Sequence, residues 1–386
     1  MAGGIEVHGH CDQKYAAVRE AFAANFASKG EVGAGFAVVS RGQVVVDLWG
    51  GHADPARTRA WKSETVTNVW STSKGVAAIC FAMIVDRGQA SYDDPVGRFW
   101  PEFAVAGKET ITIAQLLSHQ GGLCGFTVPV TMRDIADQEK AERLIAAQAP
   151  FWQPGTACGY HAVTYGTLTN ALFRRIEGRT LAKFLEQELS APLGLSLTFG
   201  LPEEQAGMAS ELIAPPELDS TSANPNTSVA QQAALANPVL DPMDANTAYW
   251  RASPMPSVNA FATAPSLARL YGALATGGGL EGVRFVSPNT IADATRLRID
   301  SDDLVLGMRA KWAAGFLLNV HDLYGDSPSA FGHSGWGGSL AFADPSRGIG
   351  VAYVMNRMGQ NLIGDPRGLA LIGATLRSAD SDRQLP

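Results

Sequence analysis

Positions 70–75 read Trp70-Ser71-Thr72-Ser73-Lys74-Gly75, so a serine stands three residues before a lysine. Residues 76–85 follow as an apolar run without proline or glycine. The run exceeds the usual length of a strand and is apolar on every face, which predicts a buried helix of about three to four turns. Charged Asp86 and Arg87 come next, and Gly88 stands where a glycine closes a helix.

Ser71 would lie at the start of this helix, with Lys74 one turn later. Residues three apart share a helix face, so the hydroxyl and the amine can touch, and a helix N-terminus favours developing negative charge. The pair therefore predicts a serine nucleophile and a neutral lysine base, whose pKa is lowered by desolvation or a nearby cation. The alternative is a serine that only caps the helix and a lysine exposed in its first turn.

The composition is that of a globular protein with a large core: 386 residues, 46% hydrophobic and 17% charged. The net charge of −7 argues against nucleic acid or an anionic membrane as the main partner. No secretory signal is expected at the N-terminus, and no apolar run approaches the length of a membrane span. The cysteines form no C-x-x-C pair, which predicts a reduced, cytoplasmic protein; they are Cys11, Cys80, Cys124 and Cys158.

Strand patterns occur near both chain ends, with a helical block between them. Two strands at 33–40 and 43–49 are joined by Arg41-Gly42, which is a hairpin turn signal. Further strands are predicted at 314–320, 338–343 and 348–354, and helices at 13–29, 131–148, 164–177, 181–189, 266–276 and 369–376. The pattern predicts an α/β (α+β) fold, in which an antiparallel sheet built from both chain ends is flanked by helices and carries a mainly helical insertion.

The predicted sheet domain comprises residues 1–90 and 258–386, and the mainly helical domain residues 91–257. Within the latter, residues 202–257 form a long irregular stretch rich in proline. Such a stretch is typical of a lid or a wall of a binding site, although a mobile surface excursion is an equal alternative. His8 and His10 are interpreted as part of a mobile tail rather than a site.

A second candidate segment spans residues 154–166 and places Tyr160 between a turn and a helix. A tyrosine acts as a general base only as a phenolate or when it shares a proton with a cationic neighbour. Lys74 could supply that cation. The alternative is a tyrosine packed at the junction of a loop and a helix.

A third candidate segment spans residues 331–339, Phe331-Gly332-His333-Ser334-Gly335-Trp336-Gly337-Gly338-Ser339. Glycines this dense at the start of a strand let a substrate approach the backbone closely. An edge strand beside the nucleophile can donate a main-chain N–H to an oxyanion. The alternative is a glycine-rich hairpin or bulge.

Together the three segments resemble the serine β-lactamase and DD-peptidase superfamily. They are most similar to its esterase branch, the family VIII carboxylesterases, which look like class C β-lactamases. Order and spacing agree over most of the chain. The segments that carry the resemblance are residues 45–51, 71–74, 100–103, 116–123, 160–166 and 332–335.

The resemblance implies that Ser71 is the nucleophile, Lys74 its general base and Tyr160 the proton shuttle. His333-Ser334-Gly335 stands where the β-lactamases carry Lys-Thr-Gly. The residue after it, Trp336, would give its backbone N–H to the oxyanion hole, with the N–H of Ser71 as the other donor. His333, Ser334 and Gly335 would line the substrate site.

Two departures narrow the expected substrate. Tyr160-His161-Ala162 replaces Tyr-x-Asn, which removes an amide that would hold a substrate's amide side chain. His333 replaces the lysine that would bind a carboxylate. We therefore expect a carboxylesterase that hydrolyses short-chain neutral esters through an acyl-serine, with weak or absent β-lactam hydrolysis.

An acyltransferase, an amidase or a peptidase would use the same acyl-serine and differ in the acyl acceptor. A catalytically silent scaffold is a further alternative, against which the joint presence of Ser71, Lys74 and Tyr160 counts. The sequence lacks a G-x-S-x-G elbow, which argues against an α/β-hydrolase. A triad of Ser71, His333 and an aspartate stays open, but Lys74 makes it unnecessary.

Metal chemistry is not expected. His119, His161 and His333 do not have the spacing of metal ligands, so we predict neither a metal nor a cofactor.

Overall fold

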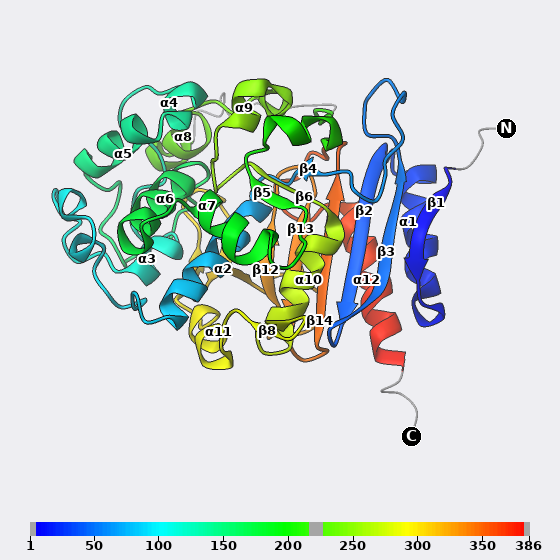
Figure 1. The fold of residues 1–386 in the computed structure, drawn as a ribbon. Helices are drawn as coiled ribbons and strands as arrows, with labels where there is room; N and C mark the ends of the chain where they lie inside the picture. The colour runs from blue at the N-terminus through cyan, green and yellow to red at the C-terminus, as the bar shows by residue number, and fades with distance from the viewer. Residues whose placement is uncertain (1–4, 216–226, 382–386) are drawn as a thin grey trace.

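The computed structural model describes residues 5–215 and 227–381. Within them, a nine-stranded antiparallel sheet has the order β1-β3-β2-β14-β13-β12-β11-β10-β9 (Figure 1). Its strands are β1 (Val7–Cys11), β2 (Gly33–Ser40), β3 (Gln43–Gly51), β9 (Ile299–Asp302), β10 (Arg309–Trp312), β11 (Leu317–Leu318), β12 (Phe331–Ser334), β13 (Leu340–Asp344) and β14 (Ile349–Met355). The two chain ends meet where β2 pairs with β14. The predicted fold class is confirmed.

The predicted β2–β3 hairpin is present, with Ser40 opposite Gln43. Its two turn residues, Arg41 and Gly42, have φ angles of 48° and 82°. Two consecutive positive φ angles are typical of the turns whose twist matches that of paired strands.

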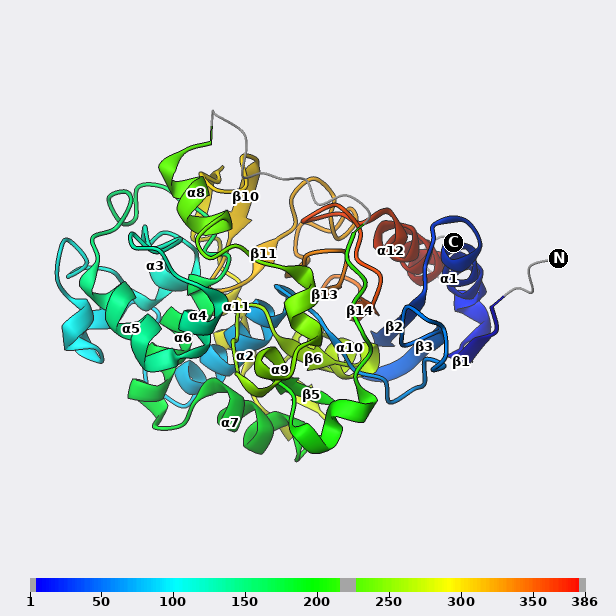
Figure 2. The ribbon, with the colours of Figure 1, turned by 90° about the horizontal axis from the view of Figure 1, so that it is seen from above.

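Helices cover both faces of the sheet. On one face α1 (Ala16–Ser28) packs against α12 (Pro366–Asp380), and on the other lie α10 (Ala264–Ala275) and α2 (Thr72–Asp86) (Figure 1). The remaining α-helices are α3 (Ile113–Leu117), α4 (Met132–Ala136), α5 (Gln138–Ala147), α6 (Thr164–Glu177), α7 (Leu181–Leu185), α8 (Val229–Leu235), α9 (Ala248–Ala252) and α11 (Pro288–Ala294). Viewed from above, α3, α4, α5 and α6 lie on the side of the molecule away from α1 and α12 (Figure 2). The division into a sheet domain and a mainly helical domain, with boundaries at 90/91 and 257/258, stays a prediction.

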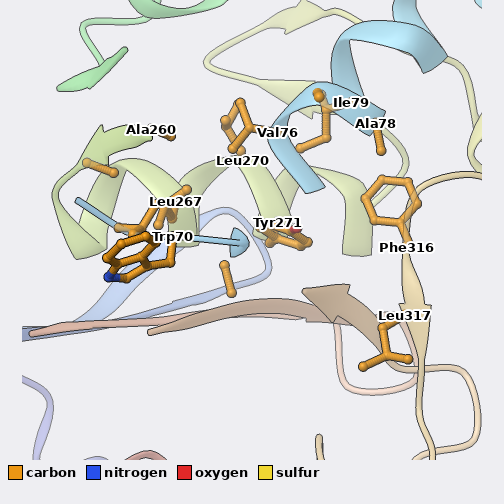
Figure 3. Packing of buried hydrophobic residues seen from close by; sticks show 14 of the residues in the cluster. Trp70, Val76, Ala78, Ile79, Ala260, Leu267, Leu270, Tyr271, Phe316 and Leu317 are labelled. Atoms are coloured by element: carbon orange, nitrogen blue, oxygen red, sulfur yellow. The ribbon is translucent and has the colours of Figure 1, made fainter. Parts of the chain in front are cut away.

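Helix α2 is the buried helix that the sequence predicts. Every residue from Thr72 to Ile84 is buried, and Gly88 follows the C-cap Arg87 with a φ of 71°. Figure 3 shows the packing around it, where Trp70, Val76, Ala78 and Ile79 lie among Leu267, Leu270, Tyr271, Phe316 and Leu317. A helix apolar on all faces is stable only inside such a core, so its N-terminus is held rigidly.

The N-terminal segment is a strand, so its interpretation as a mobile tail is wrong. β1 pairs with β3, with His8 opposite Trp49 and His10 opposite Asp47. The three central residues of β1 are exposed. The strand therefore lacks the alternation of apolar and polar residues by which a half-buried strand is recognised.

Three further expectations differ in detail. Residues 131–148 form two helices, because Asp137 has φ −76° and ψ 88° and its side chain caps the second one by accepting from the Lys140 amide. Residues 314–320 contribute only the two-residue strand β11. Residues 202–257 include α8 and α9, and residues 216–226 of this stretch lie outside the described residues.

A three-stranded sheet, β4 (Thr67–Asn68), β6 (Ala260–Ala262) and β5 (Leu197–Phe199), lies beside the start of α2. The Ser73 hydroxyl accepts a hydrogen bond from the Ala260 amide at 2.9 Å. The same hydroxyl donates to the Trp70 carbonyl. This sheet therefore anchors the first turn of α2.

Candidate active site

Ser71 immediately precedes Thr72, the first residue of α2. Its side chain makes no capping hydrogen bond, so the capping alternative is wrong. Its Oγ lies 3.0 Å from Nζ of Lys74. The i, i+3 contact expected from the sequence is present.

Lys74 is completely buried and bonds to backbone carbonyls. Its Nζ donates to the Ala162 oxygen at 2.8 Å and to the Ser257 oxygen at 3.0 Å. Desolvation lowers the pKa of Lys74 well below its ordinary value. Nζ of Lys74 is thus surrounded by three oxygens, and a neutral amine that keeps its two N–H groups on the carbonyls would turn its lone pair to the Ser71 hydroxyl.

Tyr160 lies beside this pair. Nζ of Lys74 is 4.7 Å from the centroid of the Tyr160 ring. Burial raises the pKa of Tyr160, and a hydrogen bond with Ser71 offsets part of that rise. The phenol is therefore protonated and able to donate a proton. The structure thus brings Ser71, Lys74 and Tyr160 into one cluster.

Asp303 is a positioning residue that the sequence did not reveal. It is 1% exposed, and its Oδ1 accepts from the backbone amides of Tyr160, Val305 and Leu306, each at 2.9 Å. Its Oδ2 accepts from Nε1 of Trp312 at 3.2 Å, and the Trp312 ring stacks on Tyr160 with 5.8 Å between centroids. One carboxylate thus fixes the Tyr160 backbone and its stacking partner. Its neighbours in the sequence carry no signal for this role.

The third segment begins on an interior strand, so the expectation of an edge strand is wrong. β12 lies between β13 and β11. Its pairing with β11 covers only Phe331 and Gly332. His333 and Ser334 lie beyond the end of that pairing, which leaves their side of the strand open toward Ser71.

The segment then turns sharply. The Gly335 carbonyl accepts from the Gly338 amide at 3.1 Å, which makes Trp336 and Gly337 the central residues of a β-turn. Gly337 has a φ of 84°, as the second central residue of a type II turn requires. The amides of Trp336 and Ser71 donate to no group within residues 5–215 and 227–381. Both expected oxyanion donors are therefore available.

Close backbone contact holds this turn against the start of α2. A Cβ on Gly335 would lie 2.3 Å from the Val69 carbonyl oxygen and 2.2 Å from Oγ of Ser339. Ser339 donates to that same Val69 oxygen at 2.7 Å, and its Oγ lies 3.1 Å from Oγ1 of Thr72. Only glycine fits at position 335.

Trp70 packs against the segments that carry Ser71 and Trp336. It has a φ of 48°, an unfavourable conformation for a bulky residue that persists only where its surroundings impose it. Its ring makes edge contacts with Trp250 at 5.3 Å and with Trp336 at 5.0 Å. These rings hold the backbone immediately before Ser71.

The histidines of the site are uncharged at neutral pH. Burial and the nearby Lys74 lower the pKa of His333 to about 3, and burial lowers the pKa of His161 to about 4. His161 accepts from the Leu123 amide at 3.1 Å and its Nδ1 lies 2.7 Å from the Gly159 oxygen, so it ties two loops together.

His333 does not complete a triad. Its Nδ1 lies 2.8 Å from the Ser334 carbonyl oxygen, to which it donates. Its Nε2 has no partner in the part of the chain that the structure describes. The triad alternative with Ser71 is therefore not supported.

A small pocket of about 260 Å³ lies over Ser71. It is lined by Ser71, Tyr160, Leu306, Trp312, Leu317, His333, Ser334, Leu362 and Ile363. In the described ranges, no three His, Cys, Asp or Glu side chains are grouped so that they could hold a metal ion. No helix of these ranges has the length and apolarity that crossing a membrane requires.

Comparison with known proteins gives a consistent result. Residues 18–374 match the family model described as Beta-lactamase. The "Esterase/beta-lactamase LipL" of Mycobacterium tuberculosis is 32% identical over 381 residues, which cover 92% of this chain and 84% of that protein.

Two crystal structures are similar over almost the whole chain. A family VIII carboxylesterase superposes with a TM-score of 0.93 at 43% identity, covering 97% of this chain and 100% of the other. A penicillin-binding protein homologue from Caulobacter crescentus superposes with a TM-score of 0.91 at 45% identity, with the same coverage. These matches confirm the resemblance that the three sequence segments indicate. The chain belongs to the β-lactamase family.

Proposed function

We propose that this protein is a carboxylesterase that hydrolyses short-chain neutral carboxylic esters through an acyl-Ser71 intermediate. The observation that carries the proposal is the 3.0 Å contact between Oγ of Ser71 and the buried, carbonyl-bonded amine of Lys74. Desolvation lowers the pKa of Lys74, which favours the neutral amine that can act as a base. That arrangement supplies an activated nucleophile without a histidine.

Acylation begins when Lys74 takes the Ser71 proton as Oγ attacks the ester carbonyl. The backbone N–H groups of Ser71 and Trp336 stabilise the resulting oxyanion. The C–O bond to the alcohol then breaks, and Tyr160 gives its proton to the leaving alkoxide. Lys74, now an ammonium group, returns a proton to the Tyr160 phenolate, which leaves an acyl-Ser71 and a free alcohol.

Deacylation reverses these roles. Water attacks the acyl carbonyl and passes its proton to the Lys74–Tyr160 pair. The pair then returns a proton to Oγ of Ser71 as the acid leaves. Because two groups share the protons, the apparent pKa values of the reaction belong to the pair.

The chemistry around His333 favours neutral substrates. An imidazole whose pKa is about 3 carries no charge at pH 7 and offers no counter-ion to a substrate carboxylate. Ala162 likewise presents only a methyl group where related enzymes carry an amide. A β-lactam or a peptide C-terminus would therefore leave its carboxylate unpaired, which binding sites disfavour.

The similar proteins agree with this chemistry, since they include an esterase/β-lactamase and a family VIII carboxylesterase. An acyltransferase, an amidase or peptidase, or a weak β-lactamase would use the same acyl-serine. A silent scaffold would have no need of a buried lysine beside a serine, because removing an amine from water costs stability.

The test is an assay of a short-chain p-nitrophenyl ester with wild type, Ser71→Ala and Tyr160→Phe. Ser71→Ala should abolish turnover and Tyr160→Phe should lower kcat by about 10²-fold or more. Matched controls are Ser63→Ala, an exposed serine, and Tyr165→Phe, whose hydroxyl has no described partner.

Two outcomes would contradict the proposal. An inactive wild type that takes no serine-reactive label would remove the enzyme assignment, and full activity in Ser71→Ala would remove the nucleophile. A nitrocefin assay run beside it tests the β-lactamase alternative, for which we expect little turnover.

We also propose a cytoplasmic location, with a small-molecule ester as partner and neither nucleic acid nor membrane. All four cysteines are free thiols, which suits a reducing compartment. The net charge of −7 does not favour polyanionic partners. Fractionation of the source cells with an antibody to the protein tests the location.

A further inference from the structure

A second and larger pocket opens directly beside the one over Ser71. Its volume is about 930 Å³, part of which is open to solvent. The two pockets share four lining residues, Leu306, Leu317, Leu362 and Ile363. The two spaces therefore adjoin at these four side chains.

The larger pocket is mainly apolar. Beyond the shared residues its wall is formed by Met308, Ala310, Val320, Leu323 and Leu369, with Arg309, His321, Asn361 and Gly364 completing it. The guanidinium of Arg309 is already paired, since its Nε lies 2.7 Å from Oδ1 of Asp300. Burial of a hydrocarbon group against such a wall is favourable, whereas a charged group would find no partner for its charge there.

The position of Tyr160 decides which half of an ester lies there. Tyr160 protonates the leaving oxygen, so the alcohol half of the substrate lies on the Tyr160 side of Ser71. Asp303 binds the amides of Tyr160 and Leu306 with the same oxygen atom, each at 2.9 Å. It also holds Trp312, whose ring stacks on Tyr160. The wall of the larger pocket therefore begins beside the proton donor.

We propose that this pocket is the alcohol subsite, and that the preferred substrates are neutral esters of a short acid with a larger apolar alcohol. The inference rests on the proposed ester hydrolysis and names its substrate class. The small space over Ser71 limits the groups held at the nucleophile, whereas the larger pocket has room for a branched, cyclic or extended hydrocarbon.

The experiment compares acetate esters of methanol, ethanol, butanol, hexanol and cyclohexanol. All of them form the same acetyl-enzyme, so differences in kcat/KM report the alcohol alone. Each buried methylene should raise kcat/KM by about fourfold. Hexyl acetate has four more methylenes than ethyl acetate, so we expect it to exceed ethyl acetate by roughly tenfold if two of them are buried and by about 250-fold if all four are. This series is the alcohol arm of the experiment. In the acyl arm, kcat/KM is compared among the ethyl esters of acetic, butyric and hexanoic acid, which differ only in the acyl group.

Two variants fill the pocket from different elements, Val320→Trp from the segment after β11 and Leu369→Trp from α12. In each, the hexyl-to-ethyl ratio of kcat/KM should fall to near one, and the acyl arm should keep its wild-type ratios. Val283→Trp changes an exposed valine outside the pocket and should leave every ratio as in wild type. Because each ratio is measured within one enzyme preparation, partial loss of folded protein does not affect it.

The outcomes distinguish failure of the alcohol subsite from failure of the esterase assignment on which it rests. A wild type that hydrolyses ethyl acetate without preference for larger alcohols overturns the subsite and leaves the esterase assignment intact. A shift of the acyl arm in Val320→Trp and Leu369→Trp, with the alcohol arm unchanged, assigns the pocket to the acyl group and also overturns it. Failure to hydrolyse any ester overturns both.

Discussion

The two sides of the pocket over Ser71 are built in different ways. One side carries Ser71, Lys74 and Tyr160, which come from the start of α2 and from the loop before α6 and are joined by hydrogen bonds and ring contacts. The other side carries Leu306, Leu317, Leu362 and Ile363, which come from separate strand ends and loops. The chemistry thus depends on a few short segments that each carry a sequence pattern, whereas recognition depends on apolar residues without such a pattern.

The two sides also differ in how they respond to change. Lys74 is held by backbone carbonyls that do not depend on side-chain identity. The side chains of the apolar wall are held by packing, and the Leu306 amide is in addition bound by Asp303. Substitutions on the first side should therefore change kcat, whereas substitutions on the second should change the preference among substrates.

The largest effect is expected for Lys74→Met, which keeps a long side chain and removes the base. We expect kcat for a p-nitrophenyl ester to fall by about 10³-fold or more, while the melting temperature stays equal or rises because a buried amine is gone. Lys74→Arg should not restore activity, since a guanidinium stays charged. Activity within tenfold of wild type in either variant would contradict the assignment of the chemistry to the side of the pocket that carries Lys74.

The pH dependence of kcat/KM should reflect the protonation of Lys74. Desolvation lowers the pKa of Lys74, so the neutral amine persists below the ordinary pKa and is lost as the pH falls through the lowered value. We expect kcat/KM to decline on the acidic side, by about tenfold per pH unit below that value. A profile measured with an ester that stays flat down to pH 5 would contradict the neutral lysine.

Gly335→Ala tests how closely the turn must approach α2. A Cβ there would lie 2.3 Å from the Val69 oxygen, so the turn and the Trp336 amide must move. Such overpacking costs about 1–3 kcal/mol of stability, and we expect kcat to fall by more than tenfold because one oxyanion donor is displaced. Gly207→Ala is the control, since a Cβ there meets nothing within 4 Å.

Asp303→Asn should affect both sides at once. The amide replaces one acceptor oxygen by a donor that faces backbone N–H groups, which costs about 1–3 kcal/mol. We expect a lower melting temperature, a several-fold drop in kcat and a weaker preference among alcohols. Asp302→Asn, at the exposed neighbouring position, is the matched control. A change in melting temperature with wild-type kinetics would mean that Asp303 supports only the fold.

The smallest effect concerns stability at mildly acidic pH. The pKa of His161 falls from 6.5 to about 4 in the folded chain, so below pH 6.5 the unfolded chain binds a proton that the folded chain does not. Stability should therefore fall from pH 6.5 toward pH 4, by at most about 1.4 kcal/mol per pH unit for this group. In urea unfolding, the free energy of unfolding of His161→Gln should decline less steeply with falling pH than that of wild type. An equal slope would show that His161 does not contribute to the pH dependence of stability.

Local patterns explain what the sequence could predict. The apolar run after Lys74, the Arg41-Gly42 turn and the three segments are each readable within about a dozen residues, and the structure has the helix, the hairpin and the cluster. β1 was missed because its central residues are exposed, and the interior position of β12 was missed because its partner β11 has only two residues. Asp303 follows another aspartate, and only the distant Tyr160 amide and Trp312 indole N–H reveal its role.

The measurement that tests the account most directly is mass spectrometry of the protein quenched during turnover of a short-chain acetate ester. The account predicts that the peptide containing Ser71 gains one acetyl group in wild type, and that Ser71→Ala gains none. An acetyl group on a different residue, or continued turnover in Ser71→Ala, would contradict it.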